Sequence, residues 1–270
     1  MTSMLPVNGG SVAYETVGRG GTPILLIPGI GDTRSSYRAL VPLLVKAGHT
    51  VHSLDLRGHG GSDAAFDSYR SEDIGDDVVA LLNALELQDA LLVGNSVGAA
   101  AIVHASLESE RVAGLVLLSG FVSDPPNFGV MRLALQVMFA WPWGVWSWGM
   151  YRKTLFKSTP SDFDAHHIKL LSNLGESGRL RAVRRMMTAS KASIAERLSK
   201  VSVPALIAMG ASDPDFADPA EEARLQAERL GGANQVVMID QAGHYPQIER
   251  PDVTARAILD FIAETESNGA

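Results

Sequence analysis

The stretch Gly94-Asn95-Ser96-Val97-Gly98 decides the fold of this chain. It stands between the apolar run Ala90-Leu91-Leu92-Val93 and the small-residue run Ala99-Ala100-Ala101-Ile102-Val103. This order predicts a buried strand, a sharp turn and a helix, with Ser96 at the turn. A serine in such a turn adopts a strained backbone conformation that lifts its hydroxyl clear of the sheet. The glycines on either side leave room for the turn.

Two candidate partners follow Ser96 along the chain. Asp213 comes after the apolar run 203–210, which predicts a strand, and His244 comes after a second predicted strand at 235–240. All three side chains therefore stand just past the carboxyl end of a strand. In an open parallel sheet these ends share one edge, where sites assemble. The chain order predicts a catalytic triad of Ser96, Asp213 and His244 at that edge.

Four motifs occur along the chain in the order typical of the α/β-hydrolase superfamily, and the chain resembles this superfamily from about Val12 to about Ile262. The motifs are the loop Pro28-Gly29-Ile30-Gly31-Asp32, the loop Asp55–Asp63, a Gly-x-x-Asp-Pro element at 210–214 and the Gly-His pair at 243–244. The resemblance implies an α/β fold with a mostly parallel, doubly wound sheet and a helical cap inserted after the sixth core strand. We expect the core at residues 1–120 and 201–270, and the cap at residues 121–200.

Apolar runs along the chain agree with alternating strands and helices. Residues 11–17 alternate and predict an edge strand, whereas residues 24–27, 51–54 and 112–118 predict strands that are covered on both faces. Helices are expected at 34–46, 71–85 and 252–265, and residues 218–221 predict the start of another helix. Strands separated by helices imply a parallel sheet with right-handed crossovers.

The predicted cap contains every tryptophan of the protein, at positions 141, 143, 146 and 148. Most of these rings are expected to fill the interior of the cap and its contact with the sheet. A few are expected to face a cavity and bind an apolar substrate group, and the candidates for this pocket are Trp141, Trp143, Phe139 and Tyr245. Arg132, Pro142 and the neighbouring glycines interrupt the apolar stretch, which argues against a membrane-spanning helix. Attachment to a membrane surface stays open.

The overall composition restricts the kinds of binding partner and cellular compartment that are expected. A net charge of −7 argues against a nucleic-acid partner, because phosphate binding needs clustered positive charge. The absence of cysteine excludes disulfides and thiolate metal sites and fits a reducing compartment. Residues 1–10 lack the pattern of a signal peptide, so a cytoplasmic location is expected. No feature of the sequence specifies an oligomeric state.

The triad predicts a serine hydrolase, and we expect a carboxylesterase that acts on an apolar ester without metal or other cofactor. His244 would accept the proton of Ser96, and Asp213 would orient the imidazole. Asp213 is preferred to Asp124 and to Asp215, which is expected to point elsewhere. The resemblance places the oxyanion hole at the backbone N–H groups of Val97 and Ile30.

Two other functions stay open. One is a cofactor-free carbon–carbon bond hydrolase, to which the Asn95-Ser96 pair is similar. The other is a small-molecule receptor or regulator that retains the triad. His59 is expected to be structural or solvated, and the adjacent pair His166-His167 is not expected to share a metal, because neighbouring residues face different sides of a helix.

Overall fold

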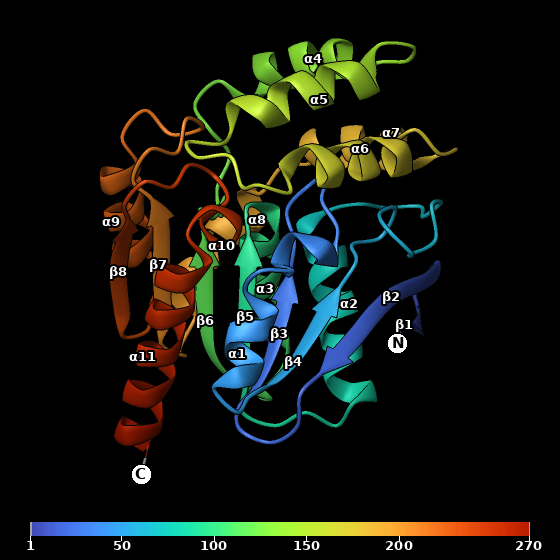
Figure 1. The fold of residues 1–270 in the computed structure, drawn as a ribbon. Helices are drawn as coiled ribbons and strands as arrows, with labels where there is room; N and C mark the ends of the chain where they lie inside the picture. Colours follow the sequence, from blue (N-terminus) through green and yellow to red (C-terminus); the bar gives the residue numbers. More distant parts are fainter. Residues whose placement is uncertain (1, 270) are drawn as a thin grey trace.

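The computed structural model describes the backbone of residues 2–269 and the side chains of residues 2–267. One sheet of eight strands forms the centre of the molecule, in the order β1-β2-β4-β3-β5-β6-β7-β8 (Figure 1). The strands are β1 (Thr2–Val7), β2 (Gly10–Val17), β3 (Pro23–Ile27), β4 (Thr50–Leu54), β5 (Ala90–Asn95), β6 (Val112–Leu118), β7 (Ala205–Gly210) and β8 (Asn234–Ile239). The pairs β1–β2 and β2–β4 are antiparallel, and every other pair is parallel.

Helices cover both faces of this sheet, as a doubly wound fold requires. On one face lie α1 (Val41–Lys46) and α11 (Pro251–Gly269), and on the other lie α2 (Ser71–Ala84), α3 (Val97–Glu108) and α9 (Pro219–Arg229). Each face has its own buried apolar cluster. The central strand β5 is buried along its whole length, which explains why its sequence is an apolar run without alternation.

Two sequence predictions are wrong at the start of the chain. The strand over 11–17 is not an edge strand, because β2 pairs on its other side with β1. The turn between them places Gly9 at φ +86°, a conformation that favours glycine. The helix expected at 34–46 is split into a 3₁₀ helix, η1 (Arg34–Tyr37), and the short helix α1. Pro42 in the first turn of α1 fits a helix that begins there.

The segment between β6 and β7 contains only helices among its described elements. They are α4 (Phe128–Met138), α5 (Gly144–Thr154), α6 (Phe163–Leu174), α7 (Arg179–Met187), α8 (Ala192–Ala195) and the 3₁₀ helix η2 (Leu198–Lys200). Figure 1 shows α4 to α7 stacked over the carboxyl ends of the parallel strands. By contrast, α8 and η2 return to the sheet, where Ile194 and Leu198 join its core. In the described residues no helix is both long and apolar enough to cross a membrane.

Candidate active site

Ser96 stands between β5 and α3 in a strained conformation, with φ 56° and ψ −119°. Its backbone N–H donates to the Leu118 carbonyl at 3.1 Å, which ties the turn to the end of β6. The neighbouring glycines cannot be larger. A Cβ on Gly94 would lie 2.3 Å from the Gly98 carbonyl oxygen, and a Cβ on Gly98 would lie 2.4 Å from the Ile27 oxygen. The backbone therefore approaches itself too closely for a side chain at either glycine position.

His244 and Asp213 form a buried pair beside this turn. Nδ1 of His244 lies 2.8 Å from Oδ2 of Asp213, and the two residues are only 3% and 2% exposed. Backbone contacts fix the histidine loop, since His244 donates to the Leu155 carbonyl at 2.9 Å. The side chain of Asn95 donates to the His244 carbonyl at 3.1 Å. Asn95 thus joins the turn of the nucleophile candidate to the loop of the base candidate.

Asp215 does not point elsewhere, contrary to the sequence prediction. Its Oδ2 lies 3.7 Å from His244 Nδ1, and its two carboxylate oxygens accept the Tyr151 hydroxyl at 2.8 and 2.9 Å. Asp215 also donates its backbone N–H to Oδ1 of Asp213 at 3.0 Å. The second carboxylate is therefore held near the imidazole by a tyrosine of α5, although Asp213 makes the closer contact.

The two carboxylates change the acidity of the imidazole. Burial by itself would lower the pKa of His244, but the attraction and hydrogen bond of Asp213 outweigh it, with Asp215 in support. The pKa of His244 is consequently raised above its ordinary value of 6.5. Burial also raises the pKa of Asp215, while His244 and Tyr151 oppose that shift.

Asp213, Asp215 and His244 are close enough together to be considered as metal ligands. Their atoms already have other partners, however. The imidazole Nδ1 is hydrogen-bonded to Asp213, and Asp215 accepts from Tyr151. A cation would have to displace both protons, so the hydrogen bonds favour an acid–base pair over a metal site.

The two residues predicted to supply backbone amides to a substrate oxygen, Val97 and Ile30, both line the cavity that contains Ser96. Val97 begins α3, so its N–H has no acceptor within the helix, and Ile30 follows β3 on the other side of Ser96. This position, between β3 and β5, is where the strand order reverses. The loop of Ile30 is fixed by His59, whose Nε2 accepts the Gly31 N–H at 3.0 Å. Burial lowers the pKa of His59 to about 4, which keeps this ring a neutral acceptor.

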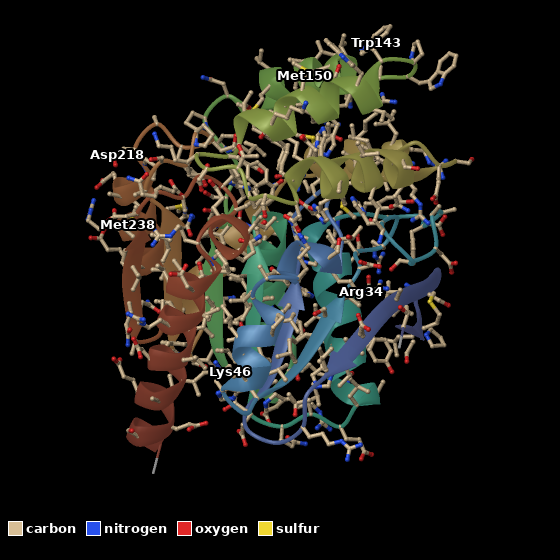
Figure 2. The ribbon with its side chains drawn as sticks, viewed as in Figure 1. Arg34, Lys46, Trp143, Met150, Asp218 and Met238 are labelled. Carbon is tan, nitrogen blue, oxygen red and sulfur yellow. The ribbon has the colours of Figure 1, made fainter. Side chains whose placement is uncertain are left out.

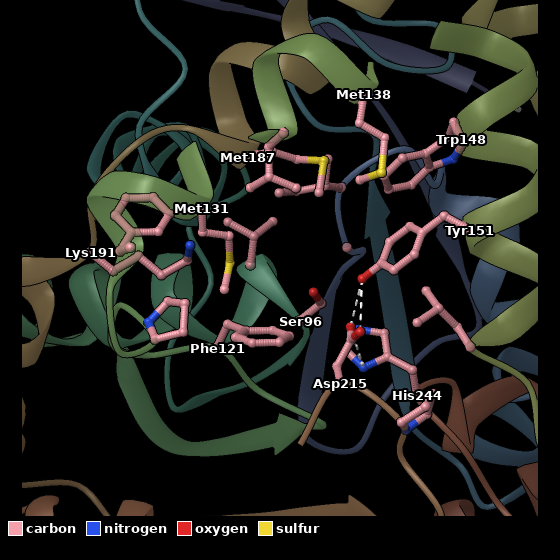
Figure 3. A pocket seen from close by; sticks show the side chains of 18 of the residues that line it. Ser96, Phe121, Met131, Met138, Trp148, Tyr151, Met187, Lys191, Asp215 and His244 are labelled. Carbon is pink, nitrogen blue, oxygen red and sulfur yellow. Dashed lines mark hydrogen bonds and ion pairs between the residues drawn. The ribbon is translucent and has the colours of Figure 1, made fainter. Parts of the chain in front are cut away.

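A cavity of about 340 Å³ opens above Ser96 and His244 (Figure 3). The two oxyanion-hole candidates and Tyr245 also line it. The other lining groups are mostly apolar: Phe121, Pro125, Phe128, Met131, Leu135, Met138, Trp148, Leu155, Met187 and Pro214, with Tyr151, Asp215 and Lys191 as the polar members. The cavity therefore combines a polar floor with an apolar roof.

The predicted pocket residues are only partly correct. Tyr245 lies in the wall, but Trp141 is 81% exposed and Trp143 49%, and neither lines the cavity. Figure 2 shows Trp143 at the outer side of the molecule, above α5. Phe139 is fully buried and packs against Trp148, with ring centres 5.5 Å apart, instead of facing the cavity. Of the four tryptophans only Trp148 lines the pocket.

The roof that the sequence prediction missed comes mainly from α4. Phe128, Met131, Leu135 and Met138 all line the cavity, and they recur at a spacing of three to four residues. This spacing places them on one face of a helix. The periodicity was readable in the sequence, but the tryptophans were the more conspicuous signal.

Ion pairs and hydrogen bonds hold the helices of residues 121–200 against the loops of the site. Arg152 of α5 is fully buried and its Nη2 lies 3.6 Å from Oδ1 of Asp32. His166 bonds to the Ser35 hydroxyl at 2.8 Å, whereas His167 approaches Arg152 at 3.4 Å, so the two histidines have different partners. Helices α5 and α6 are therefore fixed to the segment after β3.

Comparison with known proteins identifies the family. The model of the alpha/beta hydrolase family matches residues 24–257. The chain belongs to this family.

Relatives within the family have diverse names. The chain is 28% identical over 268 residues to the dihydrolipoyllysine-residue acetyltransferase component of an acetoin cleaving system from Pseudomonas putida, covering 92% of this chain and 65% of that protein. It is 26% identical to a 2-hydroxy-6-oxononadienedioate/2-hydroxy-6-oxononatrienedioate hydrolase from Paraburkholderia xenovorans, covering 93% and 90%. A putative aryl esterase structure from Burkholderia cenocepacia is 23% identical, with a TM-score of 0.81 and coverage of 99% and 100%, which shows the shared fold.

Proposed function

We propose that this protein is a serine carboxylesterase that cleaves an ester with an apolar part through Ser96, His244 and Asp213. The observation that carries the proposal is the convergence of three features on one cavity. They are the strained turn at Ser96, the 2.8 Å contact between His244 and Asp213, and the apolar roof. Ser96 and His244 are both in the cavity wall, within reach of one substrate.

In the proposed reaction, Ser96 Oγ attacks the ester carbonyl while Nε2 of His244 takes its proton. The hydrogen bond from Nδ1 to Asp213 fixes the imidazole tautomer and stabilises the imidazolium. The N–H groups of Val97 and Ile30 bind the oxyanion, and the N-terminus of α3 adds its positive end. The alcohol leaves with the proton from His244, and an activated water molecule then releases the acid from Ser96.

The helices of residues 121–200 serve in this proposal as a cap over the site. The apolar side chains of α4 face the cavity, so burial of substrate methylenes there favours binding. No metal or organic cofactor enters any step, because the nucleophile, the base and the oxyanion donors all come from this chain.

A fluorophosphonate probe tests the proposal. We expect it to label the wild type on Ser96, as located by peptide mapping, and to leave Ser96→Ala unlabelled. Ser106→Ala, a matched change near the other end of α3, should be labelled and should turn over esters like the wild type. Labelling at another residue, or ester hydrolysis by Ser96→Ala at the wild-type rate, would refute the assignment.

A carbon–carbon bond hydrolase is the second candidate, and the similarity to the Paraburkholderia enzyme favours it. A screen of aryl and alkyl esters together with a ring-cleavage dienoate separates the two. Faster turnover of the dienoate than of every ester would favour the second candidate. Tight ligand binding with almost no turnover would instead indicate a receptor.

A further inference from the structure

Lys191 is the one described lysine in the wall of the cavity, and nothing in the triad chemistry uses it. The residue stands at the start of α8 and is only 7% exposed. Figure 3 shows its side chain directed into the cavity, from the side opposite to Asp215 and His244. The apolar groups Met131 and Phe121 separate it from those two residues in this view.

The ammonium group of Lys191 has no partner among the described residues. No hydrogen bond or ion pair to its Nζ is formed there. The nearby carboxylate of Asp124 is occupied, because one oxygen accepts the Lys191 backbone N–H at 2.8 Å and the other accepts the Ser190 hydroxyl. A buried cation without a partner is unfavourable, so such a group is expected to pair with an anion when the cavity is filled.

We propose that Lys191 binds a carboxylate at the far end of the apolar part of the substrate. The substrate class is then an ester of an amphiphilic acid: a reacting carbonyl at Ser96, an apolar spacer under the methionines of the roof, and an anionic end at Lys191. This inference rests on the proposed esterase function, and it explains why a mostly apolar pocket contains a lysine. Burial lowers the pKa of Lys191, while Asp124 and Glu72 oppose that shift, and a bound carboxylate would add to their effect.

Paired substrates test the role of Lys191. The probes are 4-nitrophenyl monoesters of dicarboxylic acids from adipate to sebacate, each beside the monocarboxylate ester with the same number of carbons. At the best-fitting length, Lys191→Met should lower kcat/KM for the charged ester about ten- to a hundredfold, the range expected for a hydrogen bond to a charged group. The neutral ester should be hydrolysed as fast as before or faster, and Lys191→Arg should keep most of the preference.

Lys46→Met makes the same chemical change on the exposed end of α1, distant from the cavity (Figure 2), and should leave both rates unchanged. Equal losses on both esters in Lys191→Met would assign the lysine a structural role and overturn the proposal, as would no change at all. If the wild type hydrolyses neither ester, the esterase proposal fails by itself. In that case the role of the lysine is decided by a binding measurement. The ligands are the monomethyl esters of the dicarboxylic acids from adipate to sebacate, and the proteins are Ser96→Ala and the double variant Ser96→Ala, Lys191→Met.

A second inference concerns the outer side of α4 and α5, and it rests on different residues. No residue of α4 is buried, and the side chains of Val130, Leu133 and Val137, on the face opposite the cavity, are apolar and exposed. We call these side chains the outer apolar surface: Val130, Leu133, Val137, Trp141, Trp143, Trp146 and Met150. Trp141 is 81% exposed, Val130 78% and Trp146 68%. An exposed apolar face of a helix is normally covered, and patches of this kind mark interaction sites.

Charge around the outer apolar surface indicates what covers it. The whole chain has a net charge of −7, yet residues 125–161 contain no Asp or Glu. On α4 and α5, the exposed residues Arg132 and Lys153 form no ion pair among the described residues. A second copy of this surface would bring these cations together. An anionic lipid surface would attract them, and tryptophan favours the interface between lipid and water.

We infer that the outer apolar surface rests on the surface of an anionic membrane, with α4 separating lipid on one side from the substrate cavity on the other. Three of the four tryptophans, Trp141, Trp143 and Trp146, belong to this surface, so the protein's fluorescence reports mainly on it. Vesicles of phosphatidylcholine with phosphatidylglycerol should bind the protein, and binding should shift the tryptophan emission to shorter wavelength. High salt should release the protein from the vesicles.

The double change Leu133→Ser, Trp141→Ser should abolish this binding, and Lys153→Gln should weaken it about fivefold. Val236→Ser, at an exposed valine on β8, is the matched control and should bind like the wild type. Absence of binding to these vesicles would overturn the inference. So would a concentration-dependent dimer in solution that protects the tryptophans from a soluble quencher.

Discussion

Replacing Asp213 by asparagine removes the charge beside His244 while it keeps the shape of the side chain. Oδ2 of Asp213 lies 2.8 Å from Nδ1 of His244, and Oδ1 accepts the Asp215 N–H at 3.0 Å. An asparagine keeps the second bond by placing its oxygen toward Asp215, which turns its NH₂ group toward Nδ1. The imidazole proton must then move to Nε2, the atom that has to accept the proton of Ser96. Loss of the correct tautomer lowers kcat about ten-thousandfold, or about 5.5 kcal/mol in the barrier.

Asp215→Asn is the informative comparison, because Asp215 is 3.7 Å from the same nitrogen and makes no hydrogen bond to it. Its replacement leaves the tautomer intact, so kcat above the pKa of His244 should stay within about tenfold of the wild type. The assay is hydrolysis of a 4-nitrophenyl ester, followed at saturating substrate for both variants and for Asp260→Asn, an exposed aspartate on α11. Thermal unfolding confirms that each variant folds. A severe loss in Asp215→Asn together with an active Asp213→Asn would refute the assignment of the triad acid.

Three further outcomes are expected. The plot of kcat/KM against pH should rise as His244 loses its proton, and its midpoint should lie above 6.5 because the pKa of His244 is raised. Asp215→Asn should move that midpoint to lower pH, because the charge of Asp215 contributes to the raised pKa. A wild-type midpoint at or below 6.5 would contradict this prediction. Alkyl esters should gain about fourfold in kcat/KM per methylene, at about 0.8 kcal/mol each, until the cavity of about 340 Å³ is full, and a flat series from acetate to octanoate would disprove the acyl pocket. In urea unfolding, Gly98→Ala should lose about 1–3 kcal/mol or more, because its Cβ would lie 2.4 Å from the Ile27 oxygen, whereas Gly129→Ala, with no atom within 4 Å, should not be destabilised.

Local patterns were sufficient for the parts of the fold that depend on near neighbours in sequence. The apolar run before Ser96 forms β5, and the small residues after it form α3. Residues 112–118 form β6 as expected. Such runs are readable because a strand covered on both faces needs apolar residues at every position. Strand β1 lacked this signal, because Leu5 is its only buried residue.

The candidate site also has features that the sequence predicts and features that only the fold determines. Chain order placed Ser96, Asp213 and His244 past three strand ends, and the parallel sheet brings His244 and Asp213 into contact. The orientation of Asp215 was not predictable, because Tyr151 holds it from a helix 64 residues away. The same holds for Lys191, whose position in the cavity depends on the return of the chain to the sheet at α8.

The sequence by itself determined the strained serine turn, the parallel sheet and the order of the triad candidates, since each follows from residue spacing or from backbone sterics over a few residues. Only the tertiary structure decided which tryptophan faces the cavity. The rings of Trp141 and Trp148 are seven positions apart in one stretch, yet the first is 81% exposed and the second is 3% exposed. Composition predicts apolar surroundings for both rings. The direction of each side chain depends on how its segment packs, and this packing is set by residues distant in the sequence.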